Sequence, residues 1–288
     1  MYVGRFAPSP TGPLHFGSLV AALASWLDAR AVRGRWLVRI ENLDPPREQA
    51  GSTDVILRTL ERLGLAWDGP VVYQSLRAPL YEAALEKLRP YAYRCGCTRR
   101  EIADSSLGLA ADGARIYPGT CRPGMPQGKT PLAWRLKTSV EAIAFRDRVQ
   151  GPQSQALATQ VGDFVLYRAD GQFSYQIAVA VDDAEQGITD VVRGADLLDS
   201  TARQIYLQRL LGLPTPRYLH VPVVLDPSGN KVSKQNRAQP IDLRQRDQLL
   251  REALRFLGQP ETSDLEEAIA AWDTNRIPQR KAIALAAG

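Results

Sequence analysis

Short strand-like runs alternate with amphipathic stretches over the first part of the chain. The pattern predicts three strands, at residues 2–7, 36–40 and 71–73. A helix is predicted after each strand, and these helices begin at Gly17, at Ser52 and at Pro79. We expect residues 52–54 to cap the second helix, and the first two helices to end at Gly34 and Gly64. Such a repeat is typical of a doubly wound α/β sheet, which binds ligands at the carboxyl ends of its strands.

The pattern changes after residue 94. Thr98 and Glu101 have the spacing of a capping box, and residues 105–114 form a loop rich in glycine and alanine. Two strands are predicted further on, at residues 134–137 and 144–149. A hairpin is expected to turn at Asp170 and Gly171. We therefore expect an inserted α+β domain at residues 95–174, between two halves of the sheet.

The strand and helix pattern returns in the last part of the chain. An apolar segment at residues 177–181 ends at Asp182 and Asp183. Strands are predicted at residues 188–192 and 221–225, with a helix at residues 200–211 between them. Two short helices are predicted at residues 249–257 and 265–272. The expected organisation has four parts, which are a first half of the sheet at residues 1–94, the insertion at 95–174, a second half at 175–243 and a small helical appendix at 244–288.

Composition adds limits to this picture. The 288 residues suit one or two domains and a substantial core. The 36 basic and 31 acidic residues give a net charge of +5, which suits a polyanionic partner without requiring one. The longest apolar run, residues 19–27, is too short to cross a bilayer, and no basic and apolar leader opens the chain. We expect a soluble cytoplasmic monomer with no membrane partner.

Two polar loops could carry the chemistry. Residues 5–18 combine three prolines, which exclude helix, with His15 just before the predicted helix, where amide groups and the helix dipole favour phosphate. A histidine in such a loop is by itself more often an ordinary loop residue. A second signal follows the strand at residues 221–225, where a tight turn presents Lys231, Ser233 and Lys234 together.

The three cysteines form a separate candidate site. Cys95, Cys97 and Cys121 are too few and too close in sequence for a disulfide framework, so they indicate a structural Zn²⁺ site. The alternative is three buried, reduced cysteines. A closed zinc site needs a fourth ligand, and unaided chemistry favours a carboxylate over a phenol. The candidates for that ligand are Tyr117, Asp104, Asp112 and Glu101.

Both loops resemble the signatures of one known family. The segments RFAPSPTG at residues 5–12 and HFGS at residues 15–18 resemble the first signature of class I aminoacyl-tRNA synthetases of the glutamyl type. KVSKQ at residues 231–235 resembles the second, a Lys-Met-Ser-Lys-Ser loop. The resemblance spans residues 1–243, with departures at Ser18, Val232 and Gln235. Ser18 replaces a second histidine that many class I enzymes carry.

This resemblance implies a Rossmann-type catalytic domain that activates glutamate with ATP to form glutamyl-adenylate. The groups expected to stabilise the charge of the transition state are His15 and Lys234. The residues expected to bind ATP, which Mg²⁺ accompanies, are His15, Gly17, Ser18, Lys231, Ser233 and Lys234. Those expected to bind glutamate are Arg5, Ser9, Glu41, Tyr175 and Arg193. The resemblance also favours Tyr117 as the fourth zinc ligand, with Cys95, Cys97 and Cys121.

The length and the order of motifs resemble a short paralogue family, which transfers glutamate to the queuosine in the anticodon stem-loop of tRNA(Asp). A protein-synthesis glutamyl-tRNA synthetase is disfavoured, because about 50 residues after Gln235 leave no room for a helical anticodon-binding region. A catalytically idle, zinc-bearing RNA-binding module is a third possibility. The presence of both signatures argues against it.

Overall fold

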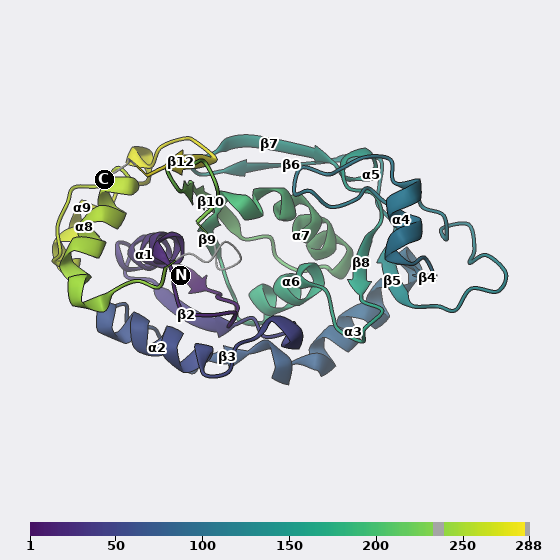
Figure 1. Cartoon of the computed structure of the whole chain (residues 1–288), viewed down its shortest axis with the longest axis horizontal. Coiled ribbons are helices and arrows are strands. Elements are labelled where there is room, and N and C mark those ends of the chain that lie inside the picture. The colour runs from purple at the N-terminus through teal and green to yellow at the C-terminus, as the bar shows by residue number, and fades with distance from the viewer. Residues whose placement is uncertain (233–238, 286–288) are drawn as a thin grey trace.

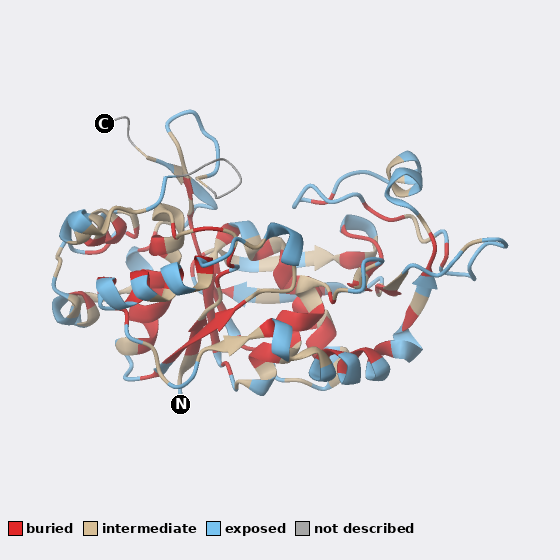
Figure 2. Ribbon diagram, turned by 60° about the horizontal axis from the view of Figure 1, so that its bottom comes forward, coloured by how far each residue is buried: buried red, intermediate tan, exposed pale blue. Residues whose placement is uncertain are grey.

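The computed structural model describes residues 1–232 and 239–285. The molecule is elongated, with the cysteine-bearing segment around helix α4 at one end and helices α8 and α9 at the other (Figure 1). The predicted α/β class is confirmed. Buried residues concentrate along the central strands and on the inner faces of the helices around them (Figure 2).

The first half of the sheet matches its predicted elements closely. Strands β1 (Val3–Phe6), β2 (Arg35–Ile40) and β3 (Val72–Tyr73) are parallel and adjacent in that order. Helices follow at α1 (Phe16–Arg30), α2 (Ser52–Leu63) and α3 (Ala78–Leu88). Gly64 ends α2 in the left-handed region, at φ +84°, as expected.

Two predicted helix ends are wrong. α1 ends at Arg30 rather than at Gly34, because residues 31–33 form a turn and Arg33 adopts a positive φ of 54°. α2 is not capped by a side chain from residues 52–54. Gly51 holds the N-cap position at φ +76° without a side-chain hydrogen bond.

The second half of the sheet has four strands, in the order β7-β6-β10-β9. β9 (Asp190–Gly194) and β10 (Arg217–Val221) are parallel. In the chain, helix α6 (Tyr175–Glu185) precedes β9, and helix α7 (Leu198–Leu211) connects β9 to β10. The strand predicted at residues 221–225 is wrong in its bounds. Pro222 has no backbone N–H, and it separates β10 from a second short strand, β11 (Val223–Leu225).

The two halves meet at β1 and β9. The N–H of Thr189 donates to the Val3 carbonyl at 2.9 Å, and the Val3 N–H donates to Thr189 Oγ1 at 2.9 Å. The carboxyl ends of the two strands therefore open side by side. This is the position in a doubly wound sheet where ligands bind.

The segment between the halves contains an antiparallel sheet of β4 (Ala92–Cys95), β5 (Ala133–Leu136) and β8 (Phe164–Tyr167). The capping box at Thr98 is confirmed, and it begins α4 (Arg99–Ser105). The remaining elements of the segment are β6 (Ala142–Asp147), β7 (Gly151–Ala156) and α5 (Leu157–Gln160). β6 pairs with β10, so these residues extend the larger sheet. β7 was not predicted, because its sequence of glycine, proline and polar residues lacks apolar alternation.

The C-terminal part packs against α1. The predicted helices are confirmed as α8 (Arg246–Phe256) and α9 (Leu265–Ala271). The ring of Phe256 contacts Phe16 edge-on, and Trp272 Nε1 donates to Asp28 Oδ1 at 3.1 Å. A strand that the pattern did not predict, β12 (Ala282–Ala284), pairs with β11. The appendix is thus not wholly helical.

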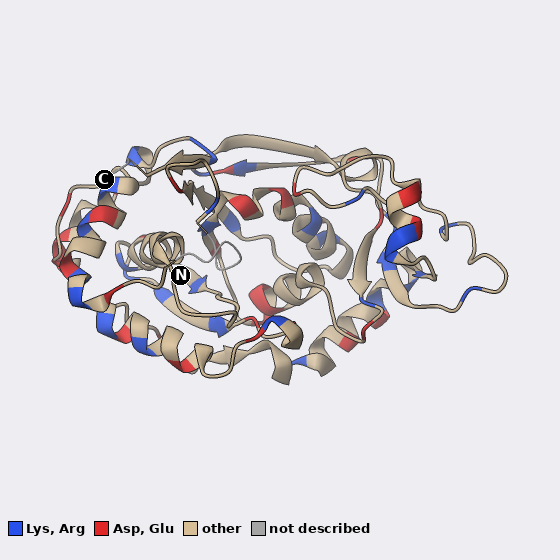
Figure 3. Ribbon diagram, viewed as in Figure 1, with Lys and Arg blue, Asp and Glu red and all other residues tan. Residues whose placement is uncertain are grey.

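Charges of both signs are interspersed along α2, α4 and α8 (Figure 3). Among the residues that the structure describes, no helix is long and apolar enough to cross a membrane.

Candidate active site

A cavity of about 400 Å³ opens where the carboxyl ends of β1 and β9 meet. It brings together most of the residues that the sequence predicted for ATP and glutamate. These are Arg5, Ser9, His15, Gly17, Ser18, Glu41, Tyr175, Arg193 and Lys231. Ser233 and Lys234 lie outside the described residues. Segments from four distant parts of the chain therefore meet in one cavity, whereas the roles of the individual residues remain predictions.

His15 is the N-cap of α1, which begins one residue earlier than predicted. Its Nδ1 accepts the backbone N–H of Ser18 at 3.2 Å. A neutral ring that accepts at Nδ1 carries its proton on Nε2, so the side chain can donate from that atom. The imidazole thus satisfies one of the amides at the helix start, where the sequence predicts a phosphate site.

Gly17 brings the two signature segments together. A Cβ at this position would lie 3.2 Å from the His15 ring and 3.4 Å from the Val232 carbonyl oxygen. A side chain at this position would therefore crowd both the His15 ring and the Val232 carbonyl. Lys231 Nζ forms an ion pair with Asp196 Oδ2 at 2.6 Å. Asp196 also lines the cavity, so an anion bound there would compete with this carboxylate for the ammonium group.

Asp183 holds two buried arginines. Arg5 Nε donates to Asp183 Oδ1 at 3.1 Å, and Arg39 Nη1 donates to the same oxygen at 2.8 Å. Burial opposes ionisation of Asp183, but the two guanidinium groups outweigh it and hold the pKa of this carboxyl below its usual range. Arg5 therefore enters the cavity with its charge already balanced.

Glu41 follows β2 and lies beside the same cluster. Arg39 Nη2 donates to its Oε1 at 3.2 Å. Burial raises the pKa of Glu41, although Arg39 and Arg5 oppose the shift. A bound ammonium group would favour the ionised carboxylate here.

The sequence did not predict that the Asp182 carboxylate accepts several buried hydrogen bonds. Its carboxylate accepts from Gln74 Nε2 at 2.8 Å, from Tyr81 Oη at 2.8 Å and from Arg77 Nε at 2.6 Å. The sequence signal was the position of two acids directly after an apolar helical segment. Acids on an inward-facing helix stay buried only when they are paired.

Arg193 differs from Arg5, the other buried arginine that lines the cavity. Its side chain is 5% exposed and donates only to uncharged groups. These are His220 Nε2 at 3.0 Å, Thr201 Oγ1 at 3.0 Å, Tyr175 Oη at 3.3 Å and the Leu197 carbonyl at 3.3 Å. Within the described part of the chain, no carboxylate forms an ion pair with Arg193. A buried charge without a partner is costly, and an anion entering the cavity would compensate it.

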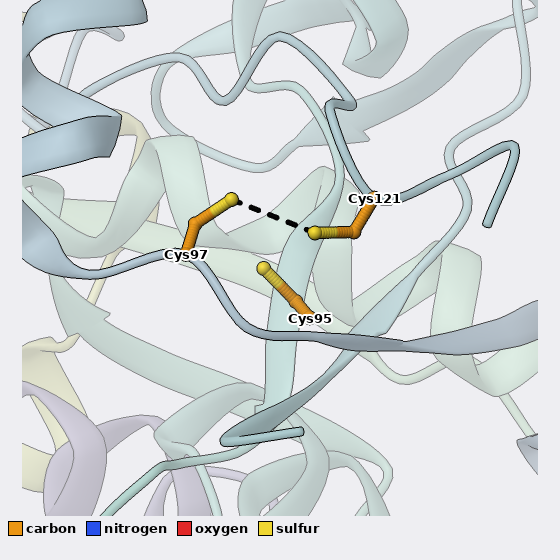
Figure 4. A group of neighbouring side chains, drawn as sticks. All are labelled: Cys95, Cys97 and Cys121. Carbon is orange, nitrogen blue, oxygen red and sulfur yellow. Dashed lines mark hydrogen bonds between the residues drawn. The ribbon is translucent and has the colours of Figure 1, made fainter. Parts of the chain in front are cut away.

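The cysteines form a second cluster, in the segment around α4. The three sulfur atoms lie within 4.8 Å of one another, and Figure 4 shows them converging, with Cys97 and Cys121 at 3.5 Å. Tyr117 Oη lies 3.4 Å from the sulfur atoms of both Cys95 and Cys97 and accepts the backbone N–H of Cys121 at 2.9 Å. Three thiols and a fourth polar atom at these separations fit a tetrahedral metal site.

The carboxylates considered as fourth ligands are engaged elsewhere. Glu101 binds the backbone of Thr98 and pairs with Lys129. Asp112 pairs with Arg203 and thereby ties the glycine- and alanine-rich loop to helix α7. Asp104 lies 4.0 Å from Arg100 at the surface. The structure thus places Tyr117, and none of these acids, beside the cysteines.

The chain matches the family described as tRNA synthetases class I (E and Q), catalytic domain, over residues 2–263. A glutamyl-Q tRNA(Asp) synthetase from Janthinobacterium sp. (strain Marseille) is 57% identical over 282 residues, which cover 94% of this chain and 96% of that protein. A protein of the same name from Dechloromonas aromatica (strain RCB) is 53% identical, with 99% of both chains covered.

Two solved structures share the fold. A glutamate-tRNA synthetase from Elizabethkingia anophelis gives a TM-score of 0.85 at 27% identity, covering 99% of this chain and 68% of that one. A glutamate tRNA ligase from Elizabethkingia meningosepticum CCUG26117, in complex with its amino acid, gives 0.83 at 27% identity, covering 98% and 66%. This chain spans about two thirds of the length of those two enzymes.

Proposed function

The chain belongs to the family of class I tRNA synthetases (E and Q), catalytic domain, and we propose that it activates L-glutamate with ATP and transfers it to the queuosine of tRNA(Asp). The name of the curated relatives supports this acceptor, since they match over nearly their whole length. The observation that carries the choice of amino acid is Arg193, a buried cation that faces the cavity without a carboxylate partner among the described residues.

Activation needs a nucleophile and a stabilised leaving group. A carboxylate oxygen of glutamate would attack the α-phosphorus of ATP, forming an acyl phosphate bond while the bond to the bridging oxygen breaks and pyrophosphate leaves. Negative charge builds on the phosphoryl oxygens during this step. The Nε2–H of His15 and the ammonium group of Lys231 are the described donors that line the cavity for that charge. Lys234 has the same proposed role but lies outside the described residues.

Glutamate would occupy the part of the cavity between β1 and β9. Arg193 would bind the side-chain carboxylate, because its charge is uncompensated, and the Tyr175 hydroxyl lies 3.3 Å from the same guanidinium. Glu41 would bind the α-ammonium group. Arg5 and Ser9 complete the proposed pocket near the α-carboxylate.

Two metal ions belong to the proposal in different ways. Mg²⁺ would enter with ATP as part of the substrate and neutralise its β- and γ-phosphates. Zn²⁺ would be held by Cys95, Cys97, Tyr117 and Cys121, where it stabilises the local fold. We also propose that residues 95–174 form an inserted zinc-bearing segment, of which β6 and β7 join the larger sheet, and that residues 244–288 form an appendix, of which β12 pairs with β11.

The test is charging of purified tRNAs with labelled glutamate, with and without queuosine. We expect charging of tRNA(Asp) only when queuosine is present. The product should still form after the terminal ribose is oxidised with periodate while the queuosine diol is protected and then restored. Charging of tRNA(Glu) on its terminal adenosine would instead identify a protein-synthesis enzyme. Absence of ATP–pyrophosphate exchange with glutamate would indicate an idle RNA-binding module.

A further inference from the structure

A buried chain of hydrogen bonds runs from Asp147 through His220 to Arg193. Asp147 Oδ2 lies 2.6 Å from His220 Nδ1, and Arg193 Nε donates to His220 Nε2 at 3.0 Å. The three residues are 1%, 0% and 5% exposed. Neither Asp147 nor His220 lines the cavity, so the proposed glutamate contacts do not include them.

The strands fix this arrangement. His220 and Arg193 are register partners on the adjacent parallel strands β10 and β9. Asp147 ends β6, and its Oδ1 accepts the backbone N–H groups of Val149, Gln150 and His220. The carboxylate is therefore held by its own turn and by the strand that carries the histidine.

The protonation of His220 follows from its two neighbours. A carboxylate accepts only, so Nδ1 of the ring must donate to Asp147. The guanidinium of Arg193 donates only, so Nε2 must accept. Both conditions are met by the neutral Nδ1–H tautomer. Burial lowers the pKa of His220 to about 4, and the charge of Arg193 adds to that effect, whereas the hydrogen bond to Asp147 opposes it.

A neutral ring between the two charges has a specific consequence. Were Asp147 in direct contact with Arg193, the pair would be electrically balanced, as Arg5 and Asp183 are. The imidazole instead lies between the two groups. Its hydrogen bond to Asp147 fixes the ring, the ring in turn fixes the guanidinium, and the carboxylate does not contact Arg193 directly. The orientation of the Arg193 guanidinium is thereby fixed, but its positive charge is not neutralised by a carboxylate in direct contact.

We propose that Asp147 and His220 are positioning residues that orient Arg193 toward the side-chain carboxylate of glutamate and preserve the discrimination against glutamine. The inference rests on the proposed function. Glutamine has the same shape but offers an amide, which cannot compensate a buried cation. Both the affinity for glutamate and its preference over glutamine should therefore depend on the acceptor at His220 Nε2.

Two substitutions separate positioning from packing. His220→Gln can place an amide oxygen at the position of Nε2 and keep the acceptor for Arg193, although the donor to Asp147 is lost. His220→Asn can keep the donor to Asp147 but leaves Arg193 Nε without its acceptor. Gln208→Leu is a packing control, because Gln208 donates to the hydroxyl of buried Tyr218 at 3.3 Å, and the ring of Tyr218 stacks on His220 while the acceptor for Arg193 Nε is left in place.

ATP–pyrophosphate exchange measures the outcome. We expect His220→Asn to raise the KM for glutamate by about 10- to 100-fold and leave the KM for ATP within about 3-fold, since one hydrogen bond to a charged group is lost. The ratio of kcat/KM for glutamate over glutamine should fall with it. His220→Gln should stay within about 3-fold of the parent, and Gln208→Leu should lower only the Tm. Equal glutamate KM values in all four proteins would overturn the proposal.

The unsubstituted protein offers a second measurement that needs no variant to fold. With ¹⁵N-labelled histidine, the ring nitrogens of His220 should show the Nδ1–H tautomer and no titration above about pH 5, while added glutamate should shift the Nε2 resonance. An Nε2–H tautomer, or titration near the ordinary pKa of histidine, would contradict the hydrogen-bond chain from Asp147 through His220 to Arg193. If the parent protein itself shows no exchange with glutamate, the proposed function fails, and the tautomer remains a separate result.

Discussion

Substitutions at single residues in and beside the cavity can separate the placement of a charge from the orientation of a side chain. His15 combines the two, because its Nδ1 caps α1 and its Nε2–H is the proposed donor to the phosphoryl oxygens. Arg193 is proposed to supply the charge that binds glutamate, whereas His220, which hydrogen-bonds to Arg193 Nε, is proposed to orient it.

His15→Asn should retain the helix cap, since asparagine is a good N-cap residue, but it removes the Nε2 donor. We expect the rate of ATP–pyrophosphate exchange to fall by about 10²- to 10³-fold, with little change in glutamate affinity or Tm. His15→Ala should lose the same activity and also about 1 kcal/mol of stability. Near-normal exchange in the asparagine variant would remove His15 from the proposed machinery.

Asp183→Asn removes the carboxylate that Arg5 and Arg39 share. Breaking a buried ion pair on one side typically costs about 3–5 kcal/mol, so we expect a large loss in the free energy of unfolding and a raised KM for glutamate. Glu185→Gln is the matched control, because Glu185 is on the same helix and pairs with Arg77 at the surface. Denaturant unfolding should show at most about 0.5 kcal/mol for this control. Similar losses in both variants would argue against the buried cluster.

The pH dependence of stability should report His220. Its pKa is about 4 in the folded chain and about 6.5 when exposed, so between these values the unfolded chain binds a proton that the folded chain excludes. Stability should therefore fall as the pH is lowered from about 6.5 to about 4, by at most about 3 kcal/mol. His220→Gln should flatten this part of the curve. Burial opposes ionisation of Asp147, but its hydrogen bond to His220 outweighs this effect and lowers the pKa of the carboxyl. The stability that this carboxylate contributes is therefore lost only at pH values below the range of His220.

Individual elements show how far the sequence could predict the structure. The α/β class, the helices α1–α3 and the capping box at Thr98 follow from local periodicity and local side-chain bonds, so a single segment contains the information. The cavity residues were predicted through two signature loops and the ends of strands. The hydrogen-bond chain from Asp147 through His220 to Arg193, like the polar cluster around Asp182 and Asp183, depends on which strands and helices become neighbours. No local pattern encodes that. β7 and β12 were missed for the same reason, because their pairing partners define them.

The proposed metal site lies within one short segment, residues 95–121, and can be tested there. Zinc should co-purify at about one ion per chain, and Cys121→Ser should lower both metal content and Tm. Tyr117→Phe keeps the ring under the guanidinium of Arg135 but removes the oxygen, so it should weaken zinc retention against a chelator. Asp104→Asn changes a rejected candidate and should leave zinc content unchanged, as measured by elemental analysis. Metal-free protein of full stability would contradict the site.

At the scale of the molecule, the two proposed chemical steps should respond differently to salt. Transfer to tRNA involves phosphate contacts that release counterions, whereas exchange with glutamate does not involve RNA. The KM for tRNA should rise by at least about 20-fold between about 50 mM and about 200 mM salt, if three or more phosphates are neutralised. Exchange measured in the same buffers serves as the control. A tRNA KM that is insensitive to salt would argue against binding through the phosphate backbone.

The contact between β1 and β9 also indicates the order in which parts of the chain fold. Hydrogen bonds join Val3 of β1 to Thr189, the residue before β9, which is 186 positions away, while the cysteine cluster closes within residues 95–121. Local closures cost less chain entropy and form early, and distant ones wait for the intervening chain. On a ribosome, the cysteine segment can fold while β9 is still unmade. The cavity between the sheet halves comes later, and β11 gains its partner only after residue 284 has been added.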